Sequence, residues 1–201
     1  MKYIAILICL MLTACVNFNY EQAIEYEQAG KFAEAEKYYK DWIQSLDDND
    51  NRKQNIKVKL LYFYINSNQL EKADRYMSFV IFKYPRPDKL RYLHHGNVAD
   101  ALYDSGNFRR AYYHYKKQSE FIEDYKKTKN NECNIDLLLI YAAELDSAMR
   151  ARLDKDNIIA MSKFRFDNLL NSKNCRNDKR LENIEFNKQK NKNITLLKLL
   201  N

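Results

Sequence analysis

Histidine is the residue type that most often combines metal binding with acid–base chemistry, and this chain has three: His94, His95 and His114. His94 and His95 are adjacent, so on a helix their side chains point about 100° apart and cannot easily share a metal ion. No cysteine or carboxylate lies at ligand spacing from them. We therefore expect no metal site.

Other catalytic signatures are also missing from the sequence. It contains no glycine-rich phosphate loop, no nucleophile elbow and no zinc signature. The acidic pairs Asp47-Asp48 and Glu123-Asp124 fit solvated caps and faces better than paired catalytic carboxylates. We predict a protein that is not an enzyme, with no cofactor and no small-molecule substrate.

Cys15 ends the N-terminal segment, in which one lysine is followed by an apolar run from Tyr3 to Leu12. That run is too short for a transmembrane helix, which needs about 20 residues, and it is typical of a secretory signal. Its end, Leu12-Thr13-Ala14-Cys15, resembles the lipobox of bacterial lipoproteins. The resemblance implies a signal peptide at 1–14 and acylation of Cys15, and Val16 resembles the outer-membrane default. The alternative is an ordinary signal peptide with an incidental cysteine.

Cys133 and Cys175 remain once Cys9 is removed with the signal and Cys15 is acylated. Two thiols in an oxidising compartment suggest a disulfide. It would join the start of the seventh predicted helix to the end of the eighth. The alternative is two independent thiols.

A repeated pattern organises the rest of the chain, with copies at residues 29–39, 67–77 and 105–115. Corresponding positions are 38 residues apart: Gly30, Asn68 and Gly106; Phe32, Leu70 and Phe108; Ala35, Ala73 and Ala111; Tyr39, Met77 and Tyr115. A fixed period in this range is the signature of a stacked-repeat architecture.

Each position in the repeat has a physical role. Gly or Asn tolerates the left-handed conformation that ends a first helix, and the following Phe or Leu anchors a second helix. The alanine lets the paired helix approach closely, and the large Tyr or Met fills the space to the next repeat. Because one helix pair cannot bury its apolar face alone, neighbouring pairs must stack. His114 takes the place of Tyr38 and Tyr76, which predicts a structural role for it.

The Gly-x-Phe-x-x-Ala-x-x-x-Tyr core at 30–39 and 106–115 resembles the tetratricopeptide-repeat (TPR) family. The period of 38 exceeds the usual length of about 34, and the extra residues fall at Asp47–Arg52 and Pro85–Asp88. The resemblance implies an all-α, TPR-like α-solenoid, with three repeats over 15–128 and a degenerate fourth repeat that caps the stack over 129–175.

Apolar periodicity predicts eight helices, at 18–29, 32–46, 54–66, 69–83, 89–105, 108–127, 135–153 and 157–172. Asp88 and Asp156 are the expected N-caps of the fifth and eighth helices. The 16 tyrosines should mostly pack between helices with their hydroxyl groups at the rim.

The C-terminal tail, residues 176–201, is basic. From Lys163 to the end there are ten Lys/Arg against four Asp/Glu, a net charge of +6. The segment fits a solvated helix whose Leu face docks on the solenoid end, or contact with anionic lipid. A nucleic-acid patch is the third reading, and the exported location argues against it, so we expect no nucleic-acid partner.

In the TPR family the first helix of each pair lines the concave, ligand-binding face. The matching residues here are Tyr20, Ile24, Gln28, Asn55, Tyr62, Asn66, Asp100 and Tyr103. The mixture suits an extended peptide or a helix of an envelope protein. Tyr62 and Tyr103 are the expected anchors, and the alternative is that both pack between helices.

The predicted function is a membrane-anchored scaffold or assembly factor of the bacterial outer membrane, facing the periplasm. Similar small repeat lipoproteins include pilotins, which serve pili and secretion systems, and the lipoprotein subunit of the β-barrel assembly machine. An adaptor or regulator of cell-wall enzymes is one alternative. A surface-exposed immunity or adhesion lipoprotein is the other.

Overall fold

The computed structural model describes residues 20–82, 89–126, 133–153, 157–176, 178, 181, 185–186 and 194–195. The described chain is all-α apart from a short ribbon of two-residue strands, and it divides into unit 1 (Met1–Lys83) and unit 2 (Tyr84–Asn201). The predicted signal peptide, Cys15, the predicted caps Asp88 and Asp156, and most of the basic tail lie outside the described residues.

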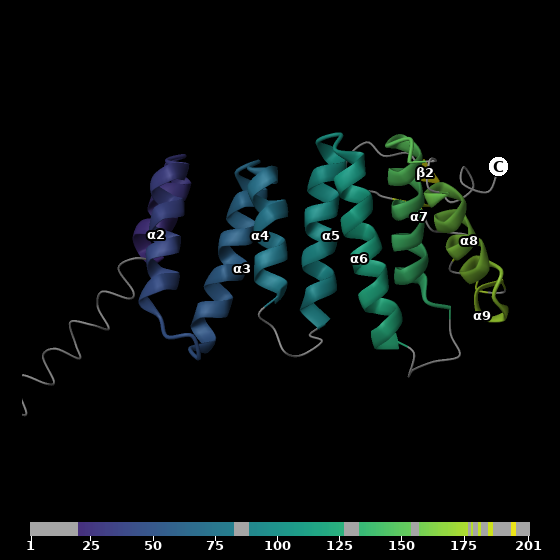
Figure 1. Cartoon of the computed structure of the whole chain (residues 1–201), viewed down its shortest axis with the longest axis horizontal. Helices are drawn as coiled ribbons and strands as arrows, with labels where there is room; N and C mark the ends of the chain where they lie inside the picture. The colour runs from purple at the N-terminus through teal and green to yellow at the C-terminus, as the bar shows by residue number, and fades with distance from the viewer. Residues whose placement is uncertain are drawn as a thin grey trace, which may run out of the picture. The chain divides into compact units, whose positions relative to one another are not determined.

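The described part of unit 1 forms two helical hairpins (Figure 1). Hairpin 1 pairs a helix at 20–28 with α2 (Phe32–Ser45), and hairpin 2 pairs α3 (Asn51–Asn66) with α4 (Leu70–Phe82). The core at the contact of the two hairpins includes Tyr39, Leu60 and Phe63, whose exposed fractions are 4%, 0% and 1%.

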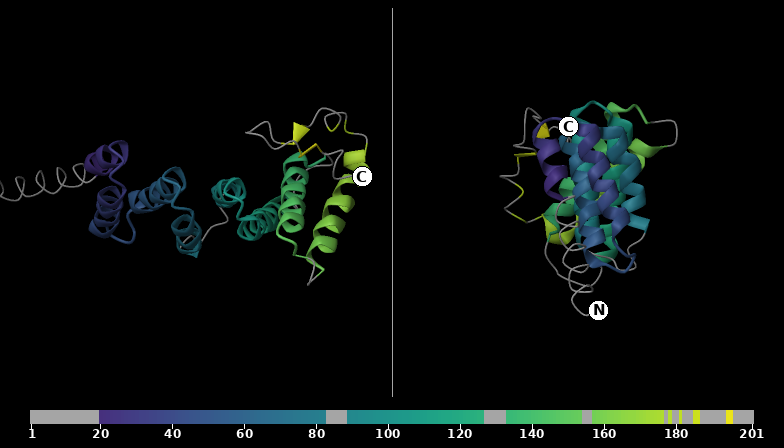
Figure 2. Two further views of the ribbon diagram at one scale, coloured as in Figure 1. Left: turned by 90° about the horizontal axis from the view of Figure 1, so that it is seen from above. Right: turned by 90° about the vertical axis from the view of Figure 1, so that its left-hand side faces the viewer.

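Unit 2 continues the pattern with two more hairpins. Hairpin 3 pairs α5 (Lys89–Asp104) with α6 (Phe108–Lys126), and hairpin 4 pairs α7 (Ile135–Arg150) with α8 (Ile158–Leu170), as two views show (Figures 1 and 2). A short helix α9 (Lys173–Arg176) follows, and strands β1 (Glu185–Phe186) and β2 (Ile194–Thr195) pair antiparallel.

The first helix of every hairpin ends in the same left-handed cap. The capping residues Gly30, Asn68, Gly106 and Arg152 have φ angles of 71°, 57°, 82° and 54°. At each cap the backbone N–H of this residue bonds the carbonyl three residues back, and the next N–H bonds the carbonyl five residues back. This is the Schellman hydrogen-bond pattern. The cap at Arg152 is the one that the repeat pattern does not predict.

The second helix of every hairpin buries a small residue and, four positions later, a large one. Ala35, Ala73 and Ala111 are all 0% exposed, and each is followed in this way by Tyr39, Met77 or Tyr115. In α8 the same positions hold Ser162 and Phe166, which are 2% and 0% exposed. The fourth hairpin therefore keeps the packing of the repeat without its sequence signature.

The described helices begin and end within three residues of the predicted ranges. The largest differences are at α3, which begins at Asn51 rather than 54, and α7, which ends at Arg150 rather than 153. The Asp50 carboxylate accepts a hydrogen bond from the Arg52 backbone N–H at 2.8 Å and caps α3 earlier than the apolar pattern indicates. α7 ends early because Arg152 adopts the left-handed cap.

A disulfide joins Cys133, just before α7, to Cys175 in α9, with an S–S distance of 2.06 Å and a Cα–Cα distance of 4.5 Å. This is the pairing that the cysteine count favours. Both residues are buried, with exposed fractions of 7% and 0%. The bond fastens the start of hairpin 4 to the segment that follows it.

Candidate functional site

The first-helix face of unit 1 carries six of the predicted partner-binding residues. Tyr20, Ile24 and Tyr62 are half-buried, and Gln28, Asn55 and Asn66 are exposed. Lys59 of α3 lies 3.9 Å from the centroid of the Tyr20 ring and donates a hydrogen bond to the Tyr20 hydroxyl at 2.7 Å. This contact links the first helices of the two hairpins, and the helical spacing places Asn55, Tyr62 and Asn66 on the same face of α3 as Lys59.

The two predicted residues of unit 2 do not form a comparable surface. Tyr103 is only 6% exposed, so the expectation that it stands at the rim is not met. Its hydroxyl hydrogen-bonds Asp146 of α7, and its ring packs edge-on against Phe108 at 5.1 Å. Asp100 is exposed, but its carboxylate already accepts a hydrogen bond from the Tyr115 hydroxyl at 2.5 Å. Tyr103 is therefore a packing residue between α5 and α7.

Tyrosine–carboxylate pairs recur in both units and involve at least five of the 16 tyrosines. Each joins a phenol to an acid on another helix: Tyr39–Glu27, Tyr64–Glu36, Tyr103–Asp146, Tyr115–Asp100 and Tyr141–Glu123. Burial raises the pKa of all five phenols, and a nearby carboxylate raises it further. The phenols are thus hydrogen-bond donors that fix helix positions.

A charged network lies at the contact of α6, α7 and α8. The Arg165 guanidinium donates to both oxygens of Glu144 at 3.0 Å and to Glu123 at 2.5 Å. Ser119 and Ser162 donate to the same Glu144 carboxylate, which is 1% exposed. Burial raises the pKa of Glu144, and Arg165 opposes the rise. Every oxygen of this acid has a partner, so the network orients three helices rather than offering a reactive carboxylate.

His95 and His114 form a buried pair between α5 and α6, with a distance of 2.8 Å between their Nδ1 atoms. Their exposed fractions are 5% and 1%. Burial lowers the pKa of His95 to about 3, and the charges of His114, Lys117 and His94 act in the same direction. His95 is therefore neutral near pH 7, and its hydrogen bond to the His114 ring is a packing role for the histidine pattern.

One hollow in unit 1 lies away from the predicted face. A groove of about 640 Å³ is lined by residues of α2, the end of α3, the α3–α4 turn and α4, namely Glu36, Lys40, Tyr64, Asn68, Gln69, Leu70, Glu71, Lys72, Arg75 and Tyr76. None of the predicted partner-binding residues lines it. We call it the α2–α4 groove.

Glu36 is the electrostatic centre of the α2–α4 groove. Lys40 and Lys72 donate to its two oxygens at 2.6 and 2.5 Å, and the Tyr64 hydroxyl donates at 2.9 Å. Burial raises the pKa of Glu36, but these hydrogen bonds outweigh burial and lower the pKa to about 2. The carboxylate is therefore charged under all physiological conditions, and it holds two lysines together at the groove wall.

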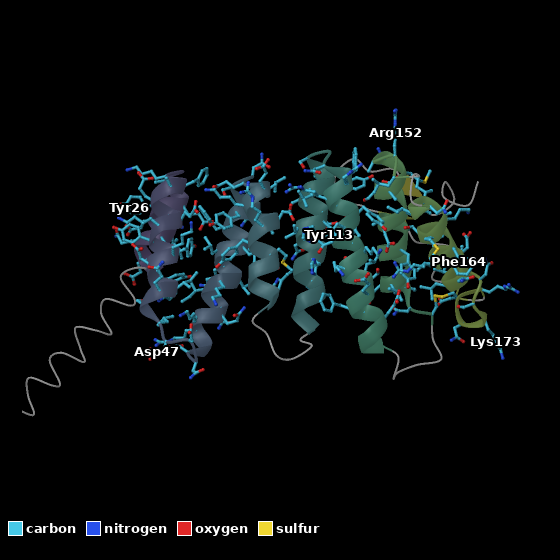
Figure 3. The ribbon with its side chains drawn as sticks, viewed as in Figure 1. Tyr26, Asp47, Tyr113, Arg152, Phe164 and Lys173 are labelled. Atoms are coloured by element: carbon cyan, nitrogen blue, oxygen red, sulfur yellow. A yellow bond between two sulfur atoms is a disulfide. The ribbon has the colours of Figure 1, made fainter. Side chains whose placement is uncertain are left out.

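Hairpin 1 lacks a neighbour on the side opposite hairpin 2 within the described chain. Tyr26 occupies the repeat position of Tyr64, which reaches Glu36 of the preceding hairpin. Tyr26 instead stacks on Tyr38 at 5.3 Å between ring centroids, at the outer side of unit 1 (Figure 3). Gln22, at the repeat position of the buried Leu60 of hairpin 2, is half-buried and donates a hydrogen bond to Glu25 at 2.9 Å, so hairpin 1 is more polar at this position than hairpin 2.

The described residues contain neither a candidate metal cluster nor a candidate membrane span. No group of three or more His, Cys, Asp and Glu side chains that could hold a metal ion occurs in this part of the chain. None of its helices is both long enough and apolar enough to cross a bilayer. Comparison with protein-family models, with curated proteins and with solved structures finds no match to this chain.

Proposed function

We propose that this chain is a non-enzymatic, TPR-like lipoprotein that binds another protein of the bacterial envelope. The observation that supports it best is the regular hairpin: three caps at a 38-residue spacing and an equivalent small–large pair in each second helix. A stack of such hairpins presents extended surfaces for peptides and helices, and it needs no catalytic residues.

The first-helix face of unit 1 is the proposed partner surface. It combines half-buried aromatic and aliphatic side chains, Tyr20, Ile24 and Tyr62, with exposed amides at Gln28, Asn55 and Asn66. Aromatic side chains contribute contact area at low entropic cost, and amides satisfy the backbone of an extended peptide. The proposed role is the assembly of a pilus or secretion system, or the biogenesis of an outer-membrane protein.

Membrane attachment through Cys15 is the second part of the proposal. It rests on the Leu12-Thr13-Ala14-Cys15 pattern alone. Cys15→Ser should abolish palmitate labelling and release the protein from membranes. A variant that stays membrane-bound and is processed at the same point contradicts lipidation, and leaves the partner surface to be judged separately.

Partner binding is tested by comparing matched variants in detergent-solubilised envelopes. As an anchor of this surface, Tyr62 should be a hot spot, so Tyr62→Ala should reduce capture of the partner about 30-fold or more with unchanged helicity. Tyr113→Ala is the control. Tyr113 is 50% exposed on the second helix α6, so this change should leave capture unchanged. Equal capture by wild type and folded Tyr62→Ala protein would remove this surface from the proposal.

A further inference from the structure

The α2–α4 groove has more positive than negative charge at its rim. Its lining contains three cations, Lys40, Lys72 and Arg75, and two carboxylates, Glu36 and Glu71. Arg75 pairs with Glu71 at 3.1 Å one helical turn away. Lys40 and Lys72 share the single carboxylate of Glu36, so two ammonium groups are balanced by one negative charge.

Both lysines are accessible from the groove. Their side chains are 52% and 50% exposed, whereas the Glu36 side chain between them is 13% exposed. A lysine ammonium has three donors and no acceptor, and the bond to Glu36 takes one donor from each. An incoming anion can therefore contact both lysines from the solvent side while Glu36 keeps them in place.

The uncharged part of the groove lining suits a peptide better than a small ion. Tyr64, Leu70 and Tyr76 contribute aromatic and aliphatic surface, and Tyr64 packs edge-on against Tyr76 at 5.6 Å. Asn68 and Gln69 of the capping turn contribute amides that can pair with a peptide backbone. A volume of about 640 Å³ lies within the range of binding sites and accommodates several residues.

We propose that the α2–α4 groove binds an acidic, extended segment of a partner protein, with one partner carboxylate bridging Lys40 and Lys72. Charge complementarity selects this occupant, because the groove lining carries three positive and two negative side chains. The proposal goes beyond the function proposed above, which places binding on the first-helix face. The two surfaces share no residue, so either can fail without the other.

The test uses hexaglutamate as the probe and the full chain in detergent micelles, labelled with ¹⁵N. Saturable shifts of the backbone amides at residues 36–40 and 68–76 support the proposal. Lys40→Gln combined with Lys72→Gln should weaken the affinity about two- to tenfold, because exposed ion pairs each contribute modestly. Glu36→Gln should strengthen it, since the lysines lose their internal counter-ion.

Two controls test whether binding depends on the charges of the groove. Lys163→Gln removes one positive charge, from an exposed lysine of α8, and should leave the affinity for the groove unchanged. Hexalysine should not shift the groove amides. The basic tail also attracts hexaglutamate, so shifts confined to residues after 163 overturn the proposal. Equal affinity of the wild type and the folded Lys40→Gln/Lys72→Gln variant also overturns it. Circular dichroism verifies that each variant is folded.

Discussion

Gly106 and Arg152 close the same pair of backbone hydrogen bonds at the ends of α5 and α7, although one is glycine and the other arginine. The N–H of Gly106 bonds the Tyr103 carbonyl at 3.0 Å, and the N–H of Arg152 bonds the Met149 carbonyl at 3.1 Å. Their φ angles are 82° and 54°. A residue with a Cβ atom is strained in this region, so hairpin 4 has a less favourable cap than hairpin 3.

Arg152→Gly should therefore stabilise the protein. Removing the Cβ relieves the left-handed strain, and the gain is partly offset by the greater freedom of glycine in the unfolded chain, which leaves about 0.5–1 kcal/mol. The Arg152 side chain is exposed and extends away from the helices, so no buried contact is lost (Figure 3). Urea unfolding gives the free energy.

Ala151→Gly is the matched control for the cap. Ala151 is the neighbouring residue and has a φ of −76°, in the right-handed helical region. Glycine there relieves no strain and adds unfolded-state entropy, so stability should fall by about 0.5–1 kcal/mol. If both glycine variants change stability equally, the strain at Arg152 does not exist.

Three of the four left-handed caps could be predicted from the sequence, and the cap at Arg152 could not. Glycine and asparagine favour the left-handed conformation, so the sequence predicts the caps at Gly30, Asn68 and Gly106. Arg152 carries no such signal, because arginine has no preference for that conformation. Ser162 likewise fills the place of the repeat alanine, but its residue type does not identify a close helix contact.

The candidate site was less predictable than the fold. Glu36 and Lys40, four residues apart, have the pattern of an ordinary solvated helix face, and only the fold brings Lys72 to the same carboxylate. Tyr103 lies on the first helix of its hairpin, where the repeat pattern predicts an exposed face. It is buried because it contacts both Phe108 of α6 and Asp146 of α7. Such pairings depend on long-range contacts that one sequence does not reveal.

Removing one partner of the buried Arg165–Glu144 pair should cost more stability than removing both charges. Arg165→Met leaves Glu144, which is 1% exposed, without its counter-ion, and we expect a loss of about 2–4 kcal/mol. Adding Glu144→Gln should restore part of that loss, because the remaining amide is neutral. Chemical denaturation of the single and double variants measures the coupling.

Lys163→Met is the control for this network. Lys163 makes an exposed pair with Asp167 at 3.2 Å on the same helix, and such pairs contribute at most about 1 kcal/mol. A loss for Arg165→Met no larger than that for Lys163→Met would mean that the buried network does not stabilise unit 2.

The buried histidine pair should make stability depend on pH. The pKa of His95 is lowered to about 3, whereas an unfolded histidine titrates near 6.5. Below pH 6.5 the unfolded chain binds a proton that the folded chain excludes, so stability falls as the pH decreases from about 6.5 towards 3. Between pH 7 and pH 5 the expected loss is about 1–2 kcal/mol.

His95→Gln separates this effect from the carboxylates. The variant should be less stable at pH 7 but should lose less stability between pH 7 and pH 5. The low pKa of Glu36, about 2, affects stability only below about pH 4.5, outside this window. Taking the difference between the wild type and the variant also cancels the contribution of Glu144. Parallel pH profiles would contradict the assignment to His95.

The disulfide between Cys133 and Cys175 should contribute about 2–4 kcal/mol, because it closes a loop with a sequence separation of 42 residues. Cys133→Ala and Cys175→Ala should each lose this stabilisation, and the double variant should lose little more. Mass spectrometry of alkylated peptides from protein purified without reductant reports the bond directly. Alkylation of both cysteines in the native protein would show that they are not paired.

Tyr103→Phe tests whether this residue belongs to the packing between α5 and α7. The change keeps the ring contact with Phe108 but removes the hydroxyl that bonds Asp146, a carboxylate with an exposed fraction of 9%. Asp146 retains the hydrogen bond from Arg150 at 2.8 Å, so the expected loss is about 1–2 kcal/mol rather than that of a fully unpaired charge.

Tyr113→Phe is the control for Tyr103→Phe, since Tyr113 is 50% exposed and its change should alter stability by less than about 0.5 kcal/mol. Thermal unfolding and partner capture measured on the same samples separate the two roles of Tyr103. A packing residue lowers the melting temperature and leaves capture by the folded fraction unchanged. If Tyr103→Phe keeps the wild-type melting temperature but weakens capture, its hydroxyl contacts the partner, and the assignment of Tyr103 to the core is wrong.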